Sequence, residues 1–185
     1  MDKSSARKLG NVCRSSITKE AFEYSKVKIF ENFKALNMRQ NYIASFISIQ
    51  TEISTHLLNE WIFSEKNLIL PKVKGSNLLF YQIKSLDEGF EKGRFDLVEP
   101  QESIHTKIQV SEIEVVLFPG MAFTQSGKRV GYGKGYYDKA LAEFKGIKIG
   151  ICFENQIVDE IFTESYDISM NYIITEKNVY KCKKD

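Results

Sequence analysis

Residues 114–141 of the chain, EVVLFPGMAFTQSGKRVGYGKGYYDKAL, combine an apolar segment, a glycine-rich loop and the start of a helix. A strand is predicted over residues 114–118 and is ended by Pro119 and Gly120, whereas a helix begins near Tyr136. A strand that leads through a loop into a helix is the building unit of α/β folds. This stretch therefore predicts an α/β architecture with a long loop after one of its strands.

The rest of the chain continues this alternation of short apolar strands and helices. Further strands are predicted over residues 42–49, 68–70, 78–83, 147–153 and 172–175. Helices are predicted from Thr18 to Asn37, from Thr51 or Ser54 to Ile62, and from Tyr136 to Gly146. Pro71 is expected to end the strand before it, and residues 89–99 show no regular pattern. The order of elements indicates a sheet with helices on both faces.

The composition is that of an ordinary globular chain. Of the 185 residues, 43% are hydrophobic and 27% are charged, which excludes disordered, collagen-like and coiled-coil classes. One domain over residues 1–185 is expected at this length. The formal net charge is +2 and the two signs interleave, so no general nucleic-acid-binding surface is predicted. The basic tail formed by Lys181, Lys183 and Lys184 is expected to fray in solvent.

The N-terminal residues and the cysteines indicate an intracellular protein. Residues 1–14 lack the apolar core of a signal peptide, and no later window approaches ~18 consecutive apolar residues, so no membrane association is expected. Cys13, Cys152 and Cys182 are too widely spaced for a disulfide framework or a zinc site, and we expect reduced thiols in a cytoplasm. Cys152 lies in an apolar run and is predicted to be a small core residue.

The loop between the strand and the helix of residues 114–141 is the candidate ligand-binding segment of the chain. Its glycines alternate with basic residues, namely Gly127, Lys128, Arg129, Gly131, Gly133, Lys134 and Gly135. Glycine this dense is costly unless the backbone turns sharply or approaches a ligand closely. Such a loop directs backbone N–H groups and the positive helix end toward one point, which favours phosphate, and Asp138 could hold Mg²⁺ nearby. A structural glycine turn is the alternative, because the spacing matches neither the P-loop nor the dinucleotide fingerprint.

RVGYGKGYYD, preceded by FPGMAF, closely resembles the signature of the 5-formyltetrahydrofolate cyclo-ligase family, also called methenyltetrahydrofolate synthetases. Three further segments follow the order of that family: Lys3 with Arg7, residues 48–53 (SIQTEI), and residues 95–100 (FDLVEP). The resemblance covers nearly the whole chain. It implies a three-layer α/β/α domain with a mostly parallel, Rossmann-like sheet.

The resemblance also implies a reaction and its partners. The family uses ATP and Mg²⁺ to convert 5-formyltetrahydrofolate into 5,10-methenyltetrahydrofolate, and it releases ADP and phosphate through a phosphorylated formyl intermediate. The expected protein is thus a cytoplasmic ligase of folate and one-carbon metabolism that forms a carbon–nitrogen bond. Its partners are two small molecules, with no nucleic acid and no membrane, and a monomer is expected.

The resemblance implies a role for each residue that matches a family motif. The implied ATP contacts are Lys3, Arg7, Arg129, Gly131, Gly133, Lys134, Gly135, Tyr136 and Tyr137. The implied folate contacts are Ile47, Glu52, Tyr132, Gly133, Lys134, Gly135 and Tyr136. Arg129 and Lys134 are the implied catalytic residues, because phosphoryl transfer needs positive charge where charge develops. Asp138 and Asp167 match the metal-binding aspartates.

Each of these residues also has an ordinary structural interpretation. Ile47 could be a core residue of a strand, and Glu52 could favour the N-terminus of the next helix. Only one of Tyr136 and Tyr137 needs to face the core, because consecutive helix residues point in different directions. Asp167 could be a solvated carboxylate.

The chain departs from the family pattern at two positions. Asn171 stands where the family often has a second aspartate, and it offers a metal a carbonyl oxygen without the charge. Ala6 replaces a larger hydrophobic residue, which suggests looser anchoring of the first helix. His56 and His105 each stand alone, without a third ligand at metal spacing, and neither is expected to bind zinc or to act as a base.

Two other functions compete with the cyclo-ligase. A non-catalytic nucleotide-binding or regulatory module would keep the glycine loop without folate chemistry, and the presence of Glu52 and Asp138 argues against it. A sugar-phosphate isomerase or acyl-CoA transferase on a similar fold would leave the long motif match unexplained. Residues 89–101 are a candidate lid, on grounds of irregularity alone.

Overall fold

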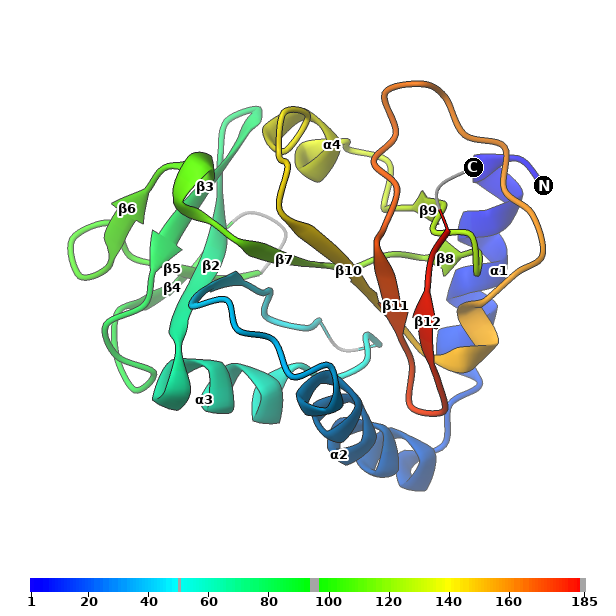
Figure 1. Ribbon diagram of the computed structural model, residues 1–185, viewed down its shortest axis with the longest axis horizontal. Helices are drawn as coiled ribbons and strands as arrows, with labels where there is room; N and C mark the ends of the chain where they lie inside the picture. Colours follow the sequence, from blue (N-terminus) through cyan, green and yellow to red (C-terminus); the bar gives the residue numbers. More distant parts are fainter. Residues whose placement is uncertain (50, 94–96, 184–185) are drawn as a thin grey trace.

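A mixed sheet of eight strands runs through the part of the molecule that the structure describes (Figure 1). The structure is a computed structural model and describes residues 1–49, 51–93 and 97–183. In spatial order the strands are β12 (Val179–Lys181), β11 (Tyr172–Ile174), β10 (Ile147–Ile151), β7 (Val115–Phe118), β1 (Tyr42–Ala44), β2 (Asn67–Lys74), β3 (Asn77–Gln82) and β6 (Thr106–Ile108). The helices are α1 (Lys3–Ser15), α2 (Lys19–Ala35), α3 (His56–Glu65) and α4 (Tyr136–Ala140), with 3₁₀ turns η2 (Val110–Glu112) and η3 (Glu154–Gln156). Two ribbons lie outside the sheet, β4 (Phe90–Lys92) with β5 (Val98–Pro100), and β8 (Ala122–Phe123) with β9 (Arg129–Val130).

The centre of the sheet is parallel, as the alternating pattern predicts. β2, β1, β7, β10 and β11 pair in parallel, whereas β12, β3 and β6 pair antiparallel at the two edges. Ile43 of β1 lies opposite Leu68 on one side and Val115 on the other. Strands buried on both faces need continuous apolar runs, and this is why these short segments are recognisable in the sequence.

Helices cover both faces of the sheet, so the predicted three-layer α/β/α class is confirmed. α2 and α3 lie on one face, where Ile62 and Leu117 belong to one buried cluster (Figure 1). On the opposite face, Phe118 packs in a second cluster with Leu141 of the segment after α4. Full burial of a side chain such as Leu or Phe stabilises the fold by about 1.5–3 kcal/mol. The adjacent positions Leu117 and Phe118 thus hold the two outer layers onto one strand.

Several predicted strand limits are wrong, for identifiable reasons. The strand predicted over residues 42–49 ends at Ala44, because the carbonyl of Phe46 accepts hydrogen bonds from Thr55 at 2.6 Å and Asn59 at 2.9 Å instead of joining the sheet. β2 continues through Pro71 to Lys74. Its neighbour β1 has already ended there, so the missing proline N–H leaves no gap between two strands.

The strands predicted over residues 147–153 and 172–175 end slightly earlier than expected, at Ile151 and Ile174. Residues 89–99, predicted to be irregular, contain the antiparallel ribbon β4–β5. The basic tail does not fray completely, since Lys181 lies in β12 opposite Tyr172. Gln50, residues 94–96 with the start of FDLVEP, and Lys184 lie outside the described residues.

Two helix limits also differ from the prediction. α3 begins at His56 after Thr55, and neither Thr51 nor Ser54 is its N-cap residue. The hydroxyl of Thr55 points inward to the carbonyl of Phe46 and gives the helix no side-chain cap. α4 spans Tyr136–Ala140 and does not reach Gly146, so it is a little more than one turn.

The first helix packs closely against the β8–β9 ribbon. Ala6 is fully buried beside Ala122 and Val130, and a Cβ placed on Gly10 would lie 2.2 Å from the carbonyl oxygen of Met121. Small residues at these two positions bring the helix backbone against the ribbon. The expectation of loose anchoring from Ala6 is therefore wrong.

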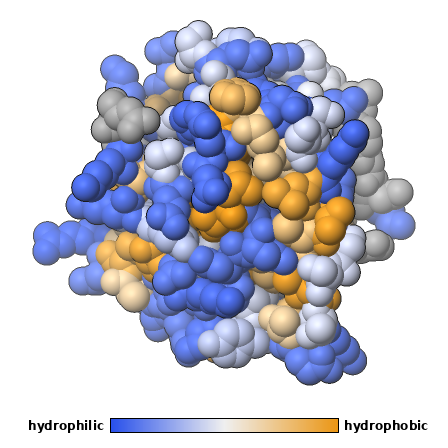
Figure 2. All heavy atoms as spheres, turned by 90° about the vertical axis from the view of Figure 1, so that its right-hand side faces the viewer, coloured by the Kyte–Doolittle hydropathy of each residue, from blue (hydrophilic) through white to orange (hydrophobic). Residues whose placement is uncertain are grey.

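No helix of the described residues is long and apolar enough to cross a membrane. The face that carries α1 and β12 is mainly hydrophilic, with smaller hydrophobic areas between the polar side chains (Figure 2). This agrees with the interleaved charges of the sequence.

The close approach at Gly10 predicts an unusual response to alanine. In an exposed helix interior, Gly→Ala stabilises a protein by about 0.5–1 kcal/mol. Because the added methyl group would overlap the carbonyl of Met121, Gly10→Ala should instead lower the free energy of unfolding by about 1–3 kcal/mol. Urea unfolding measures the effect, with Lys8→Ala on the exposed side of the same helix as the control. A more stable Gly10→Ala variant would contradict this packing.

Candidate active site

A large pocket lies beyond the carboxyl ends of β1 and β7, where the order of strands reverses direction along the sheet. In open α/β sheets such a reversal leaves a crevice that binds ligands. The pocket has a volume of about 1310 Å³. Pockets for one small ligand are typically about 300–1,000 Å³, so this one has room for two ligands side by side.

Every residue for which the sequence predicts a role lines this pocket. The set comes from four separate segments: the start of α1, the chain after β1, the loop that leads into α4, and the chain before β11. Its members are Lys3, Arg7, Ile47, Glu52, Arg129, Gly131, Tyr132, Gly133, Lys134, Gly135, Tyr136, Tyr137, Asp138 and Asp167. The fold therefore brings the predicted site residues together, while their individual roles stay predictions.

The start of α1 contacts two other pocket segments. Asp2 caps the helix by accepting the N–H groups of Ser4 and Ser5. The ammonium of Lys3 pairs with Asp167 at 2.7 Å and also contacts Glu164, whose pKa it holds below the usual value. One turn later, Nε of Arg7 donates to the carbonyl of Gly131 at 3.0 Å. The helix thus holds the glycine loop and the chain before β11 on one side of the pocket.

The glycine loop needs its glycines for backbone conformation at two positions. Gly133 has φ of 100° and Gly135 has φ of 66°, in the left-handed region that other residues rarely adopt. Gly135 is also the N-cap residue of α4. Because α4 has 5 residues, its dipole is weaker than the predicted longer helix would provide. Any anion in the loop would rely mainly on the loop amides and on the basic side chains.

Arg129, predicted to be catalytic, and Asp138, predicted to bind a metal, form one ion pair. Nη2 of Arg129 donates to Oδ1 and Oδ2 of Asp138 at 2.8 and 2.9 Å, and Nη1 donates to the carbonyl of Pro119 at 3.1 Å. The guanidinium is buried, and its position is set by a backbone carbonyl as well as by the carboxylate. A charged group held in this way needs little rearrangement when a ligand arrives.

The two aspartates predicted to hold a magnesium ion both line the pocket, and each is paired there with a basic residue, Asp138 with Arg129 and Asp167 with Lys3. Asp138 and Asp167 present hard oxygen donors, and the amide of Ile168 donates to Oδ1 of Asp138 at 3.3 Å, which ties the two segments together. No group of three or more His, Cys, Asp or Glu residues gathers among the described residues, so no all-protein metal cage forms there. Mg²⁺ commonly binds through one or two carboxylates and substrate phosphates.

Asn171, the departure from the family pattern, does not line this pocket. Its Oδ1 accepts the backbone N–H of Lys148 at 2.8 Å and thereby links β10 to the start of β11. The Asn171 side chain therefore joins two strands of the sheet.

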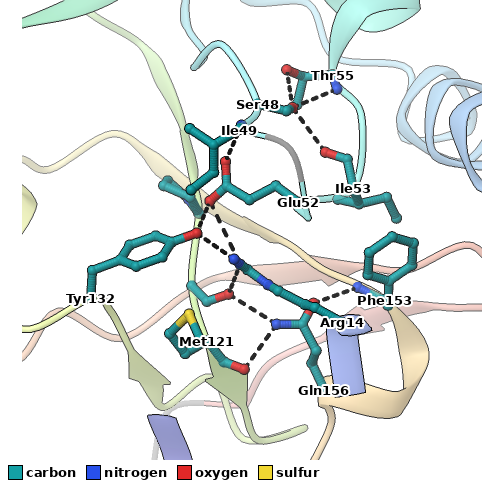
Figure 3. A network of polar contacts seen from close by, with 12 residues as sticks. Arg14, Ser48, Ile49, Glu52, Ile53, Thr55, Met121, Tyr132, Phe153 and Gln156 are labelled. Atoms are coloured by element: carbon teal, nitrogen blue, oxygen red, sulfur yellow. Dashed lines mark hydrogen bonds and ion pairs between the residues drawn. The ribbon is translucent and has the colours of Figure 1, made fainter. Parts of the chain in front are cut away.

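Glu52 also lines the pocket and lies in a buried polar network (Figure 3). Its Oε2 accepts the backbone N–H of Ile49 at 3.0 Å, and its Oε1 accepts the hydroxyl of Tyr132. The guanidinium of Arg14 lies 3.6 Å from Oε1. Burial raises the pKa of Glu52, and the hydrogen bond from Tyr132 and the charge of Arg14 oppose this effect. The side chain therefore points into the pocket network and gives α3 no cap.

The sequence did not reveal the part of Arg14, which does not line the pocket itself but contacts Glu52 and Tyr132 of its wall. Positions 3, 7 and 14 lie on one face of a helix, because spacings of four and seven residues return to the same side. That periodicity of basic residues was the available signal. The apolar wall formed by Pro71, Val73 and Leu78 of the β2–β3 hairpin was also unpredicted, since core strands carry the same residue types.

The remaining predicted residues take ordinary positions. Ile47 is half-buried in the pocket wall, and Tyr136 and Tyr137 both pack against the second core cluster while also lining the pocket. His56 is exposed and 3.5 Å from Glu60, and His105 is buried with its Nδ1 accepting the amide of Lys84.

Cys152 is a core residue, as predicted, and burial raises the pKa of its thiol well above the usual value. A thiol in this environment is a poor nucleophile at neutral pH. Cys13 and Cys182 are also free thiols.

Comparison with known proteins gives a consistent result. The model of the 5-formyltetrahydrofolate cyclo-ligase family matches residues 2–176. A probable 5-formyltetrahydrofolate cyclo-ligase of Schizosaccharomyces pombe is 29% identical over 146 residues, covering 70% of this chain and 72% of that protein. The 5-formyltetrahydrofolate cyclo-ligase of Escherichia coli strain K12 is 27% identical over 146 residues, covering 75% and 80%. The structure of Aquifex aeolicus 5,10-methenyltetrahydrofolate synthetase has a TM-score of 0.88 and 30% identity, covering 99% of this chain and 94% of that one.

The raised pKa of Glu52 predicts how stability depends on pH. Because folded Glu52 binds its proton more tightly than unfolded Glu52, its favourable contribution is complete below the unfolded pKa and is lost as pH rises through the folded pKa. Glu52→Gln removes this loss. The stability of the variant relative to the parent should therefore increase from pH 4 to pH 7, by about 1.4 kcal/mol for each unit by which folding raises the pKa.

Urea unfolding across this pH range measures the difference. Glu143→Gln, at an exposed position, is the control for removal of one carboxylate. A constant difference between Glu52→Gln and the parent at every pH would contradict the effect of burial on Glu52.

Proposed function

The chain belongs to the 5-formyltetrahydrofolate cyclo-ligase family, and from this premise we propose how its pocket carries out the reaction. As a member of the family it is a ligase that converts 5-formyltetrahydrofolate to 5,10-methenyltetrahydrofolate. We propose that the conversion consumes ATP with Mg²⁺ and releases ADP and phosphate through a phosphorylated formyl intermediate.

The observation that supports this proposal most strongly is the shared pocket. Lys3, Arg7 and the glycine loop line it together with Glu52 and the apolar β2–β3 wall. A triphosphate needs positive charge and backbone donors, whereas a reduced folate has a flat ring system suited to an apolar wall. A pocket of about 1310 Å³ accommodates the two substrates together, as a reaction between them requires.

The first step of the proposed reaction activates the formyl group. The formyl oxygen bonds to the γ-phosphorus of ATP while the bond from that phosphorus to the ADP oxygen breaks. Arg129, held by Asp138 and the carbonyl of Pro119, and Lys134 of the loop supply positive charge around the transferring group. Asp138 and Asp167 would hold Mg²⁺, which would neutralise phosphate charge.

The second step closes the ring. N10 of the folate bonds to the formyl carbon, the carbon–oxygen bond breaks, and phosphate leaves with that oxygen and takes up the proton of N10. The protein's part is to hold N10 next to the formyl carbon and to keep water away from the intermediate. Ile47 and Glu52 are the proposed folate contacts, and their position in the pocket wall suits this task.

The proposal is tested by following the absorbance of methenyltetrahydrofolate. Purified protein with 5-formyltetrahydrofolate and Mg²⁺ should form product when ATP is added and should form none when ATP is omitted. Product formation that is independent of ATP would overturn the phosphorylated intermediate. ATP binding without any product would instead support a regulatory nucleotide-binding module.

Two substitutions test the phosphate end of the pocket. Lys134→Ala and Asp138→Asn should each lower turnover by a factor of about 10² or more, because each removes a charge at the developing phosphate. Initial rates at saturating substrates measure the loss, and circular dichroism confirms that the variants are folded. Lys145→Ala, at an exposed position outside this pocket, should keep the parental rate. Parental turnover in either test variant would remove that residue from the mechanism.

A further inference from the structure

Arg14 is buried deeper than the two basic residues that precede it on the same face of α1. Its side chain is 4% exposed, and its guanidinium meets groups from two other segments (Figure 3). Nη1 donates to the hydroxyl of Tyr132, and Nη2 donates to the carbonyl of Gly120 at 2.6 Å and lies 3.6 Å from Oε1 of Glu52. A buried charge is costly unless it is paired and hydrogen-bonded, so this placement needs an explanation.

The backbone around Arg14 keeps the guanidinium in one position. Gln156 donates through Nε2 to the same Gly120 carbonyl at 3.1 Å and to the carbonyl of Met121 at 2.8 Å. Oε1 of Gln156 accepts the backbone N–H of Phe153 at 3.1 Å. The chain after β7 is thus held between Arg14 and Gln156, and the guanidinium has a rigid support on its inner side.

On its outer side, Arg14 contacts the two side chains that join the ends of the pocket. Tyr132 belongs to the glycine loop, and its hydroxyl bonds to both Arg14 and Glu52. Three titratable groups face the Glu52 carboxylate: Arg14 from α1, Tyr132 from the loop, and Tyr137 of α4, whose pKa is raised by burial and by the Glu52 charge. Among the described residues, Arg14 is the cation within ion-pair distance of Glu52.

One nitrogen of the Arg14 guanidinium lacks a hydrogen-bond acceptor. Its Nε atom is buried and has no acceptor among the residues that the structure describes. An unmet buried donor lowers stability, and native proteins keep such groups mainly where function requires them. The orientation of the guanidinium instead brings its two terminal nitrogens to Tyr132 and Glu52.

We propose that Arg14 is a positioning residue that holds the Glu52 carboxylate and the Tyr132 hydroxyl in one arrangement and so joins the folate end of the pocket to the glycine loop. The inference rests on the proposed function, since it acts through a folate contact. Arginine suits this role because its planar fork donates in two directions at once, whereas a lysine ammonium is a single point charge.

The first test uses the ligand-free protein and needs no activity. The carboxyl signal of Glu52 in ¹³C NMR is identified by its absence in Glu52→Gln and is titrated in the parent, in Arg14→Gln and in Arg14→Lys. Arg14→Gln should raise the titration midpoint by about one pH unit or more, because an opposite charge at this range lowers a carboxyl pKa by about 1–3 units. Arg14→Lys should stay closer to the parent. An unchanged midpoint in folded Arg14→Gln would overturn the proposal.

The second test measures kcat/KM for 5-formyltetrahydrofolate as a function of pH. Arg14→Gln should lower kcat/KM at least tenfold. It should also shift the acidic limb of the pH profile to higher pH, by as much as the NMR midpoint shifts. In a Glu52→Gln background the same substitution should change kcat/KM less than threefold, because Arg14 acts through Glu52. If Arg14→Gln lowered kcat/KM by the same factor in the parent and in the Glu52→Gln background, the proposal would be overturned. Arg39→Gln, at an exposed arginine, is the matched control and should keep parental values.

Arg14→Lys provides a test if Arg14→Gln does not fold. Arg14→Lys keeps the charge and loses the fork, so kcat/KM for the folate should fall at least tenfold, and parental kinetics would overturn the proposal. A parent protein that forms no product would contradict the proposed function alone. The NMR titration would still decide whether Arg14 controls Glu52.

Discussion

Parallel pairing of the five central strands is the constraint on which the rest of the molecule depends. Parallel neighbours end at the same edge of a sheet, so the chain after β1 and the chain after β7 start from adjacent points. One leads to Ile47 and Glu52, and the other leads to the glycine loop. Because the order of strands reverses between β1 and β7, the two chains diverge and leave the pocket between them.

On the wall of that pocket, each acidic residue with an expected role is paired with a basic residue. Lys3 pairs with Asp167, Arg129 with Asp138 and Arg14 with Glu52. These pairs hold the charged side chains of the site in fixed orientations. α1 takes part in two of the three pairs, and its close packing at Gly10 holds it against the ribbon beside the glycine loop. The stability of this helix and the geometry of the site are therefore linked.

The sheet was predictable where burial on both faces makes a strand apolar throughout. β7 follows this rule, β10 follows it apart from Lys148, and both were recognised close to their observed limits. β12 and the β8–β9 ribbon were not predicted, because strands of two or three residues carry too few side chains for a pattern. The end of β1 was misjudged because Phe46 stays buried after the strand stops, and sequence alone does not distinguish a paired strand from a buried extended segment.

By itself the sequence determined the α/β class, the glycine loop with its basic residues, and the motifs that the chain shares with the cyclo-ligase family. These features are local, since each depends on residues that are neighbours along the chain. Only the tertiary structure decided which charges meet: Arg129 with Asp138, Lys3 with Asp167, and Arg14 with Glu52 through Tyr132. Apart from Arg129 and Asp138, these partners are far apart in sequence, and only the packing of α1 and the strand order bring them within contact.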